Sequence, residues 1–304
     1  MFWGIVKWIL FFAGAYLSCR IILPRLARFL WEIGFTRKNY LGEEIPTGVG
    51  LLFALLVPGW MGLGVLLRLD NYTTQLTNGL DKTVYLPVNV FLFLFVALGM
   101  AFIGFVDDVF GNQDAKGFKG HFAALLHGKI TSGALKALFG GVVAAVFSAG
   151  LLVLKSGQDP WYYLVYEFLI NLSLIALAAN LINLLDLRPG RAGKAFILML
   201  VFVFFFAKKP ELFALIVPVL GILLAYLDAD LKAWVMMGDV GSNMLGGILG
   251  VMMAVCLHPT RGKLVAFFIL LGLNILSEFC SFSRLIEQNR ILRAFDQLGR
   301  RRRN

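Results

Sequence analysis

Two adjacent carboxylates, Asp107 and Asp108, end a long apolar run in the sequence Gly-Phe-Val-Asp-Asp-Val-Phe-Gly. A charge near the centre of a bilayer costs about 2.5–3.5 kcal/mol, so acids inside membrane segments are rare and usually functional. Neighbouring residues on a helix point about 100° apart, which favours one metal ligand and one proton acceptor or orienting group. Carboxylates without Cys or paired His favour a hard ion, Mg²⁺ or Mn²⁺. Taken alone, the pair is equally well explained as the place where a helix meets water.

A third acid, Asp239, follows Gly238 where a predicted helix begins. The run Gly-Asp-Val-Gly-Ser, which ends at Ser242, combines an acidic ligand with backbone N–H groups that favour anions. An Asp that simply caps the helix is the alternative interpretation, and the two can hold together. We expect this acid to share one metal ion with the helix end that carries Asp107 and Asp108.

Polar side chains also gather in the loop that follows Asn180. Asn180 and Asn183 lie three residues apart on one helix face. Because amides at an apolar helix end need partners, they either bond another helix or reach a ligand. Arg188 and Arg191 offer charge for a phosphate, but the preference for basic residues on the cytoplasmic side explains them equally well.

The run Pro-Thr-Gly-Val-Gly, which contains Thr47, leads into another apolar segment. Its glycines let the backbone turn sharply and approach a ligand, since glycine carries no Cβ. A plain helix start with a basic anchor at Lys38 is the alternative, and it is the better explanation of this run taken alone.

The composition decides which elements must position these residues. Hydrophobic residues make up 59% of the 304 and charged residues 15%, whereas water-soluble domains carry about a quarter charged residues. The chain is therefore predicted to be an all-α polytopic membrane protein with one domain over 1–304 and a basic cytoplasmic tail at 284–304. Three scattered cysteines predict neither a disulfide framework nor a zinc site. The net charge of +10 suits anionic headgroups and phosphorylated substrates.

Nine apolar segments are expected to cross a hydrocarbon core of about 30 Å, with ten spans as the alternative. The first is expected to be a retained span rather than a signal peptide. Basic residues gather in the loops on one side, which predicts that this side is cytoplasmic. Every motif described above falls on it. The expected spans are 2–23, 49–67, 86–106, 133–154, 161–182, 192–207, 212–227, 242–257 and 264–282.

Taken in chain order, the four loops that carry these motifs resemble those of the polyprenyl-phosphate N-acetylhexosamine-1-phosphate transferases, glycosyltransferase family 4. This family includes the phospho-MurNAc-pentapeptide transferase and the undecaprenyl-phosphate GlcNAc-1-phosphate transferases. The resemblance runs from about Lys38 to Arg293. Gly-Phe-x-Asp-Asp and Met-Gly-Asp-x-Gly-Ser are its specific motifs, and Pro-Thr-Gly-x-Gly supports it.

The resemblance implies roles for individual residues. Asp107 and Asp108 match the paired catalytic aspartates of the family, and Asp239 matches its metal ligand. Asn183 and Asp186 match its Asn-x-x-Asp motif. The implied catalytic residues are Asp107, Asp108, Asp186 and Lys136; the implied metal ligands are Asp108 and Asp239; the implied substrate-binding residues are Lys38, Thr47, Asn180, Asn183, Arg188, Arg191 and Ser242.

In the family, a sugar-1-phosphate moves from a UDP-sugar to undecaprenyl phosphate in the presence of Mg²⁺, and UMP is released. The resemblance therefore implies an enzyme of cell-wall or envelope synthesis in the bacterial inner membrane, with a cytoplasmic site and, by analogy, a homodimer. No nucleic-acid partner is expected. The lipid phosphate would attack the β-phosphorus. Whether one Asp acts as a base or forms an aspartyl-phosphate is left open.

The chain departs from the family pattern in four ways. Leu187 and Pro189 replace a glycine and a second aspartate, and Ala229-Asp230-Leu231-Lys232-Ala233 stands where the family has Asn-x-x-Pro-Ala. The residues from Asp296 to Arg300 stand where the family has a cluster of histidines, and nine spans replace the usual ten. By analogy, these departures concern donor recognition, whereas the metal and lipid side is retained.

Two rival functions follow from the departures and from the apolar character of the chain. The first is a non-catalytic paralogue that binds lipid phosphate or nucleotide-sugar. The second is a lipid transporter or flippase, which predicts acids at mid-span or broken helices in two matched halves. Alcohol phosphotransferases with CDP-donors are disfavoured, because their Asp-Gly-x-x-Ala-Arg run is absent from the sequence.

Overall fold

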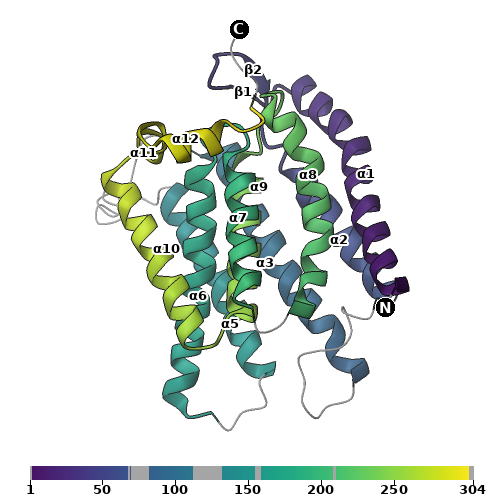
Figure 1. The fold of residues 1–304 in the computed structure, drawn as a ribbon, viewed down its shortest axis with the longest axis vertical. Coiled ribbons are helices and arrows are strands. Elements are labelled where there is room, and N and C mark those ends of the chain that lie inside the picture. The colour runs from purple at the N-terminus through teal and green to yellow at the C-terminus, as the bar shows by residue number, and fades with distance from the viewer. Residues whose placement is uncertain are drawn as a thin grey trace.

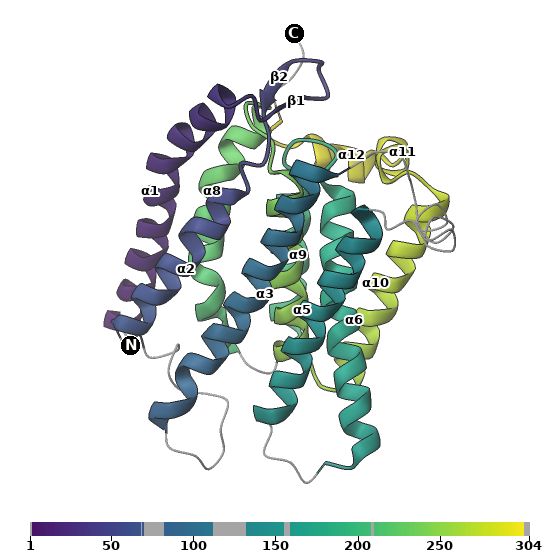
Figure 2. The ribbon, with the colours of Figure 1, turned by 180° about the vertical axis from the view of Figure 1, so that it is seen from behind.

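The computed structural model describes residues 2–67, 69, 82–111, 132–154, 159–207 and 210–300. Most of these residues belong to helices that run side by side (Figures 1 and 2). The helices are α1 (Phe2–Glu32), α2 (Leu51–Leu66), α3 (Lys82–Phe110), α5 (Ser132–Leu154), α6 (Trp161–Leu185), α7 (Arg191–Phe205), α8 (Val217–Leu231), α9 (Gly238–Cys256), α10 (Arg261–Phe279), α11 (Phe282–Gln288) and α12 (Arg290–Gln297), with a 3₁₀ helix at Pro210–Ile216.

Each of the nine expected spans overlaps one of these helices. Seven helices in the described part of the chain are long and apolar enough to cross a membrane. Helix α2 is apolar but has only 16 residues, and α7 has 15. In lipid, backbone N–H and C=O groups must be satisfied within their own segment, which is why such apolar stretches form helices. The all-α polytopic class is therefore confirmed.

A two-stranded hairpin that the sequence did not predict follows α1. Strands β1 (Thr36–Lys38) and β2 (Glu44–Pro46) pair antiparallel, with Arg37 opposite Ile45. The hairpin lies at the same end of the bundle as α11 and α12, whereas α1 begins at the opposite end (Figure 1). We call the end of the bundle that carries the hairpin the hairpin end.

Helix α9 occupies the centre of the bundle, with α3 and α6 packed against it (Figure 2). Two glycines bring its backbone against that of α6. A Cβ at Gly246 would lie 2.5 Å from the Cα of Ala179, and one at Gly250 would lie 2.5 Å from the Cα of Ile175. Small residues at such positions allow membrane helices to approach closely.

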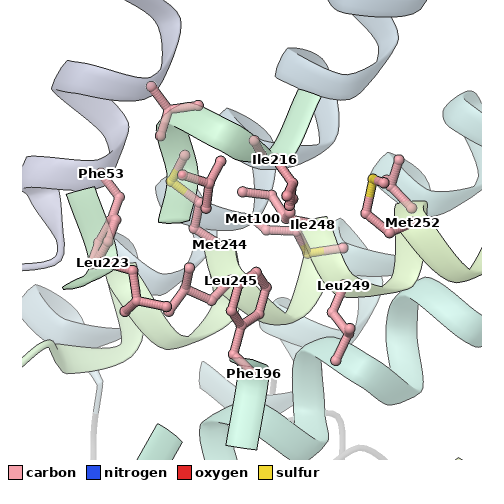
Figure 3. Close-up of a cluster of buried hydrophobic side chains, with 14 of the residues drawn as sticks. Phe53, Met100, Phe196, Ile216, Leu223, Met244, Leu245, Ile248, Leu249 and Met252 are labelled. Atoms are coloured by element: carbon pink, nitrogen blue, oxygen red, sulfur yellow. The ribbon is translucent and has the colours of Figure 1, made fainter. Parts of the chain in front are cut away.

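Large apolar side chains from the neighbouring helices surround α9 (Figure 3). Helices α2, α3, α7 and α8 and the 3₁₀ helix each contribute to this cluster. The labelled members are Phe53, Met100, Phe196, Ile216, Leu223, Met244, Leu245, Ile248, Leu249 and Met252. Close packing of this kind holds α9 in place, so the side chains near its start, including Asp239 and Ser242, have fixed positions.

Candidate active site

The ends of four helices meet at the hairpin end of the bundle, and each carries a residue that the sequence singled out. Helix α3 ends there, α5 and α9 begin there, and the last turn of α6 lies beside them (Figure 2). The residues in question are Asp107 and Asp108 on α3, Lys136 on α5, Asn183 and Asp186 at the end of α6, and Asp239 and Ser242 on α9.

Glycines place α3 and α9 at the distance that the site requires. A Cβ at Gly104 would overlap the carbonyl oxygen of Asp239. Gly238 has a φ of +73°, and a Cβ there would lie 2.5 Å from Oδ2 of Asp108. A side chain at Gly104 or Gly238 would therefore push Asp108 and Asp239 apart.

The segment that contains Thr47 docks on the chain just before α9. The N–H group of Met236 donates to the carbonyl oxygen of Pro46 at 2.8 Å, and that of Val49 donates to the carbonyl oxygen of Met236 at 3.1 Å. Thr47 itself is buried, and its N–H donates to the carbonyl oxygen of Phe35 at 3.1 Å. No contact of its hydroxyl with the site acids occurs among the described residues. Its role in binding substrate stays a prediction.

Lys136 joins two of the acids. Its Nζ lies 3.2 Å from Oδ2 of Asp107 and 2.6 Å from Oδ2 of Asp239. All three side chains keep between a fifth and a third of their surface exposed. The structure therefore brings together three of the residues that were expected to act together, and it leaves them within reach of a ligand.

Asp108 is buried and only partly satisfied. Its Oδ2 accepts a hydrogen bond from the N–H of Val240 at 3.1 Å. The guanidinium of Arg37 lies 3.7 Å from Oδ1, beyond hydrogen-bond distance, and donates to the carbonyl oxygen of Asp108 at 3.2 Å. Oδ1 has no hydrogen-bond partner among the described residues. A buried acceptor without a partner is costly, so this atom is suited to binding a ligand.

The cation beside Asp108 is Arg37, which the sequence analysis did not select. It selected Lys38, the next residue of strand β1, which is exposed and does not contact the acids in the described part of the chain. Successive side chains of a strand point to opposite faces, so only one of the two can approach Asp108. The alternation that identifies Arg37 becomes visible only once the hairpin is known.

Asp186 caps the C-terminal end of α6 and completes the group of acids. The residue keeps some exposed surface, but its carboxyl group lies among protein atoms. Burial raises the pKa of this carboxyl well above its usual range, and nearby carboxylates, first that of Asp230 and then that of Asp239, raise it further. The site thus holds more carboxyl groups than it has cations to pair with them, and this crowding disfavours ionisation of Asp186.

The two amides near the C-terminal end of α6, Asn180 and Asn183, contact different helices. Asn183 donates to the hydroxyl of Ser242 at 3.0 Å, and Ser242 in turn donates to the carbonyl oxygen of Gly238 at 3.1 Å. Asn180 donates to the side chain of Asn274 on α10 at 2.6 Å. Asn183 and Ser242 therefore belong to the site, whereas the partner found for Asn180 is another helix.

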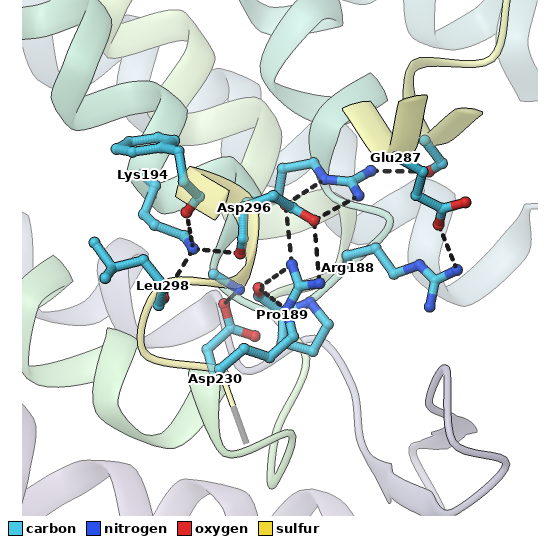
Figure 4. Close-up of polar contacts among 12 residues, drawn as sticks. Arg188, Pro189, Lys194, Asp230, Glu287, Asp296 and Leu298 are labelled. Carbon is cyan, nitrogen blue, oxygen red and sulfur yellow. Dashed lines mark hydrogen bonds and ion pairs between the residues drawn. The ribbon is translucent and has the colours of Figure 1, made fainter. Parts of the chain in front are cut away.

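Both arginines of the loop between α6 and α7 are engaged with protein carboxylates. Arg191 is buried and pairs with Asp296 at 2.9 Å. Arg188 lies 3.6 Å from Glu287 (Figure 4), and its guanidinium stacks over the ring of Tyr40 at 5.3 Å. Substrate binding by these arginines stays a prediction, and the contacts give both of them a structural role.

Asp230 of α8 is a further buried acid whose role the sequence analysis did not recognise. Its Oδ2 accepts a hydrogen bond from the N–H of Gly190 at 2.8 Å (Figure 4). The signal in the sequence was an acid near the end of an apolar span, and it was noted only as a departure from the family motif. In the structure, this acid ties α8 to the loop that carries Asp186.

The chemistry of the site acids fits a hard divalent cation. The described residues contain no group of three or more His, Cys, Asp or Glu side chains that could hold a metal ion alone. Magnesium is commonly held by one or two carboxylates together with substrate phosphates, so such a group is not required. The unpaired Oδ1 of Asp108 and the excess of carboxylates supply the donor atoms and the charge that this ion prefers.

Comparison with known proteins identifies the family. The family description that matches is glycosyl transferase family 4, over residues 90–257, which is more than half of the 304. The phospho-N-acetylmuramoyl-pentapeptide-transferase of Thermotoga neapolitana is 31% identical over 239 residues, which span 77% of this chain and 68% of that relative. The protein of the same name from Thermotoga petrophila is 30% identical over 257 residues, 83% of this chain and 73% of that relative. This multi-pass membrane protein therefore belongs to glycosyl transferase family 4.

Proposed function

We propose that this protein transfers a sugar-1-phosphate, N-acetylhexosamine-1-phosphate, from a UDP-sugar to a polyprenyl phosphate and releases UMP. The observation that carries the proposal is the meeting of Asp107, Asp239 and Lys136 from three separate helices at one end of the bundle. The names of the relatives support a phosphorylated amino sugar as the transferred group and a role in bacterial cell-wall or envelope synthesis.

We assign the hairpin end to the cytoplasmic side of the bacterial inner membrane. The basic loops between expected spans fall on this side, and basic residues mark the cytoplasmic face of membrane proteins. The hairpin, the loop after α6 and helices α11 and α12 all lie at this end (Figure 1). Nucleotide-sugars are cytoplasmic, so a donor would reach the acids from water while the lipid acceptor stays in the membrane.

Asp108 and Asp239 are the proposed ligands of Mg²⁺, or of Mn²⁺ in its place. When bound, the ion would neutralise the diphosphate of the donor and so assist departure of UMP. Asp108 suits this role because its side chain is fixed by the N–H of Val240 and has one oxygen without a partner. Asp239 suits it because α9 holds it firmly beside α3 through Gly104.

Asp107 and Lys136 are proposed to orient the acceptor. In the reaction, an oxygen of the lipid phosphate attacks the β-phosphorus, and the bond from that phosphorus to the UMP oxygen breaks. The second pKa of a phosphate monoester lies near neutrality, about 6, so the nucleophile needs positioning more than a strong base. Asp107 keeps 22% of its side chain exposed and is therefore reachable, whereas the Asp108 side chain is fully buried. An aspartyl-phosphate on Asp107 is the mechanistic alternative.

Asn183, Asp186 and Ser242 are proposed to contact the donor. They lie beside the metal ligands, and Asn183 and Ser242 are already held by hydrogen bonds. Groups held in place before the ligand arrives lose little entropy on binding, which favours a defined donor geometry.

The first test is UMP release by the purified protein with undecaprenyl phosphate, Mg²⁺ and a panel of UDP-sugars. We expect release with one amino-sugar donor and its loss in Asp108→Asn and Asp239→Asn. Asp228→Asn is a matched control, because Asp228 is an exposed acid on α8 that pairs with Arg20 and Lys232 at 2.7 Å each. Absence of release with every donor, while lipid phosphate still binds, would replace the transferase by the binding paralogue.

A further inference from the structure

Helix α12 is attached to the protein in an unusual way. Asp296 is its one buried residue, while Ile291, Leu292 and Phe295 are exposed. A helix at a membrane surface turns its apolar side chains toward lipid. The contacts that hold α12 against the bundle are those of its buried acid, and they are polar.

Two guanidinium groups bind the Asp296 carboxylate from two sides. Arg191 donates to Oδ1 at 2.9 Å and to Oδ2 at 3.1 Å, and Arg300 donates to Oδ2 at 3.1 Å and to Oδ1 at 3.0 Å. Paired hydrogen bonds between arginine and a carboxylate are strong and fix the relative orientation of both groups. Lys194 adds donation to the carbonyl oxygen of Asp296 at 2.6 Å and to that of Leu298 at 3.1 Å (Figure 4). We call Arg191, Lys194, Asp296 and Arg300 the C-terminal clamp.

The C-terminal clamp also forms hydrogen bonds with the loop that carries Asp186. Arg300 donates twice to the carbonyl oxygen of Pro189, at 3.0 and 3.2 Å. On its other side, the loop is bound to α8 through the hydrogen bond from Gly190 to Asp230. The short segment between Asp186 and α7 is thus held by α8 on one side and by the C-terminal clamp on the other.

We propose that Asp296 is a positioning residue for the active site. By orienting Arg191 and Arg300, it fixes the loop 186–190 and so sets the place of the Asp186 carboxyl relative to the other acids. The proposal rests on the proposed function for its catalytic consequence, but the holding of the loop is independent of that function. Displacement of a catalytic group by about 1 Å can cost 10²-fold in rate, so a loose loop has a measurable effect.

The test combines loop mobility with kinetics in the full-length protein. A nitroxide label is placed at Leu187→Cys, with Cys280→Ser removing the more accessible native cysteine, since Cys19 and Cys256 are buried. The same label at Trp161→Cys, at the far end of α6, serves as the control position. We expect Asp296→Asn to increase the label mobility at 187 and leave that at 161 unchanged.

The kinetic arm separates positioning from folding. We expect Asp296→Asn to lower kcat/KM for the donor, measured per folded molecule, by about 10- to 100-fold, as loss of a supporting partner commonly does. Asp296→Glu keeps the charge and should recover part of the rate. Asp228→Asn, which removes an equally paired acid elsewhere, should change neither mobility nor rate.

Each result decides the proposal. Unchanged mobility at 187 in Asp296→Asn overturns it, and so does increased mobility with an unchanged rate per folded molecule. A lower donor KM in Asp296→Asn also overturns it, because Asp296 would then be a competitor for an anion-binding site formed by the two arginines. If the unmodified protein releases no UMP, the proposed function fails, and the mobility data alone then decide whether Asp296 holds the loop.

Discussion

Two clusters of charged side chains lie near the two ends of α6, one at Glu167 and one at Asp186. Their separation of 19 residues corresponds to a helical rise of about 28 Å. The two clusters differ in how their charges are balanced. Near the start of α6, Lys263 of α10 donates to Glu167 at 2.9 Å and to Asn171 at 2.8 Å. Both charged side chains are almost completely buried. One cation faces one anion there, and the pair links two neighbouring helices.

At the hairpin end, the charges do not balance. Several carboxylates gather around Lys136 and Arg37, one oxygen of Asp108 has no partner among the described residues, and the side chains of the Lys136 group are partly exposed. A neutral, closed pair stabilises contacts between helices, whereas a group with excess charge is completed only by a ligand. The difference favours the hairpin end as the functional one, and it argues against a lipid transporter, which would place its acids at mid-span.

The strongest way to break this comparison is to remove the cation of the hairpin cluster. In Lys136→Gln, Asp107 and Asp239 lose their shared partner and repel each other. We expect UMP release to fall by about 10²- to 10⁴-fold, the range for loss of a positioned catalytic group. Lys232→Gln is the control, since Lys232 pairs with one acid away from the site. Near-normal release by Lys136→Gln would mean that the cluster is only structural.

The opposite cluster should respond in stability rather than in activity. Glu167→Gln leaves the Lys263 ammonium buried without its anion, which is expected to cost about 3–5 kcal/mol. The measurement is the free energy of unfolding in detergent micelles, together with the rate per folded molecule, which should not change. Replacing both partners, as in Glu167→Gln with Lys263→Met, should recover most of the loss. A large loss of rate in the single variant would contradict the division between the two clusters.

A backbone substitution sharpens the comparison from another side. In Gly104→Ala, the new Cβ would overlap the carbonyl oxygen of Asp239, so α3 and α9 must separate. We expect a loss of about 1–3 kcal/mol in stability and of most of the activity, because the acids move apart. Gly59→Ala on α2 has no atom within 4 Å of the new Cβ and should be neutral. If the two variants behave alike in the UMP-release and unfolding assays, the close approach of α3 and α9 at Gly104 does not matter for the site.

A smaller effect of unusual sign is expected at Asp186. Its carboxyl has a pKa well above the usual range because of burial and neighbouring acids, so ionising it in the folded protein is unfavourable. Asp186→Asn should therefore raise the free energy of unfolding by about 1 kcal/mol while it lowers the rate, the usual trade between stability and activity. A fall in the free energy of unfolding would contradict this, because it would mean that the folded protein stabilises the Asp186 carboxyl group.

The smallest effect is the pH dependence of the C-terminal clamp. Burial acts to raise the pKa of the Asp296 carboxyl, but hydrogen bonds from Arg191 and Arg300 outweigh it and hold that pKa below its usual range. The clamp thus contributes its stability above the unfolded pKa of about 3.9 and loses it as the pH falls through the lower folded value. We expect the label at Leu187→Cys to keep its mobility from about pH 8 to 5 and to loosen below about pH 4. Asp296→Asn should be loose at every pH.

The membrane helices and most of the site could be predicted from the sequence because their signals are local. Long apolar runs specify spans by length alone. The motifs around Asp107 and Asp239 each span only a few residues, and in the structure Lys136 bonds both acids. Their catalytic and metal-binding roles stay predictions, as does the single-domain description.

The remaining features depend on contacts between distant parts of the chain. The hairpin strands are three residues each, too short for a strand pattern to be recognised, so Arg37 could not be placed. Arg191 meets Asp296 across 105 residues, and Asn180 meets Asn274 across 94. An arginine near a proposed phosphate site looks the same in the sequence whether its partner is a ligand or a carboxylate elsewhere in the protein.

The different attachment of α9 and α10 has a mechanical consequence. Helix α9 touches α6 and α3 through backbone contacts at glycines, which leave no room for sliding, whereas α10 packs mainly along α6 and buries little of its surface. A thinner or thicker bilayer is accommodated by helix tilt. The peripheral α10, which contacts α6 but little of α9, is expected to tilt before α9, and it leads into the segment that carries Asp296. Lipid chain length should therefore act on the loop of Asp186 before it disturbs the acids held between α3 and α9.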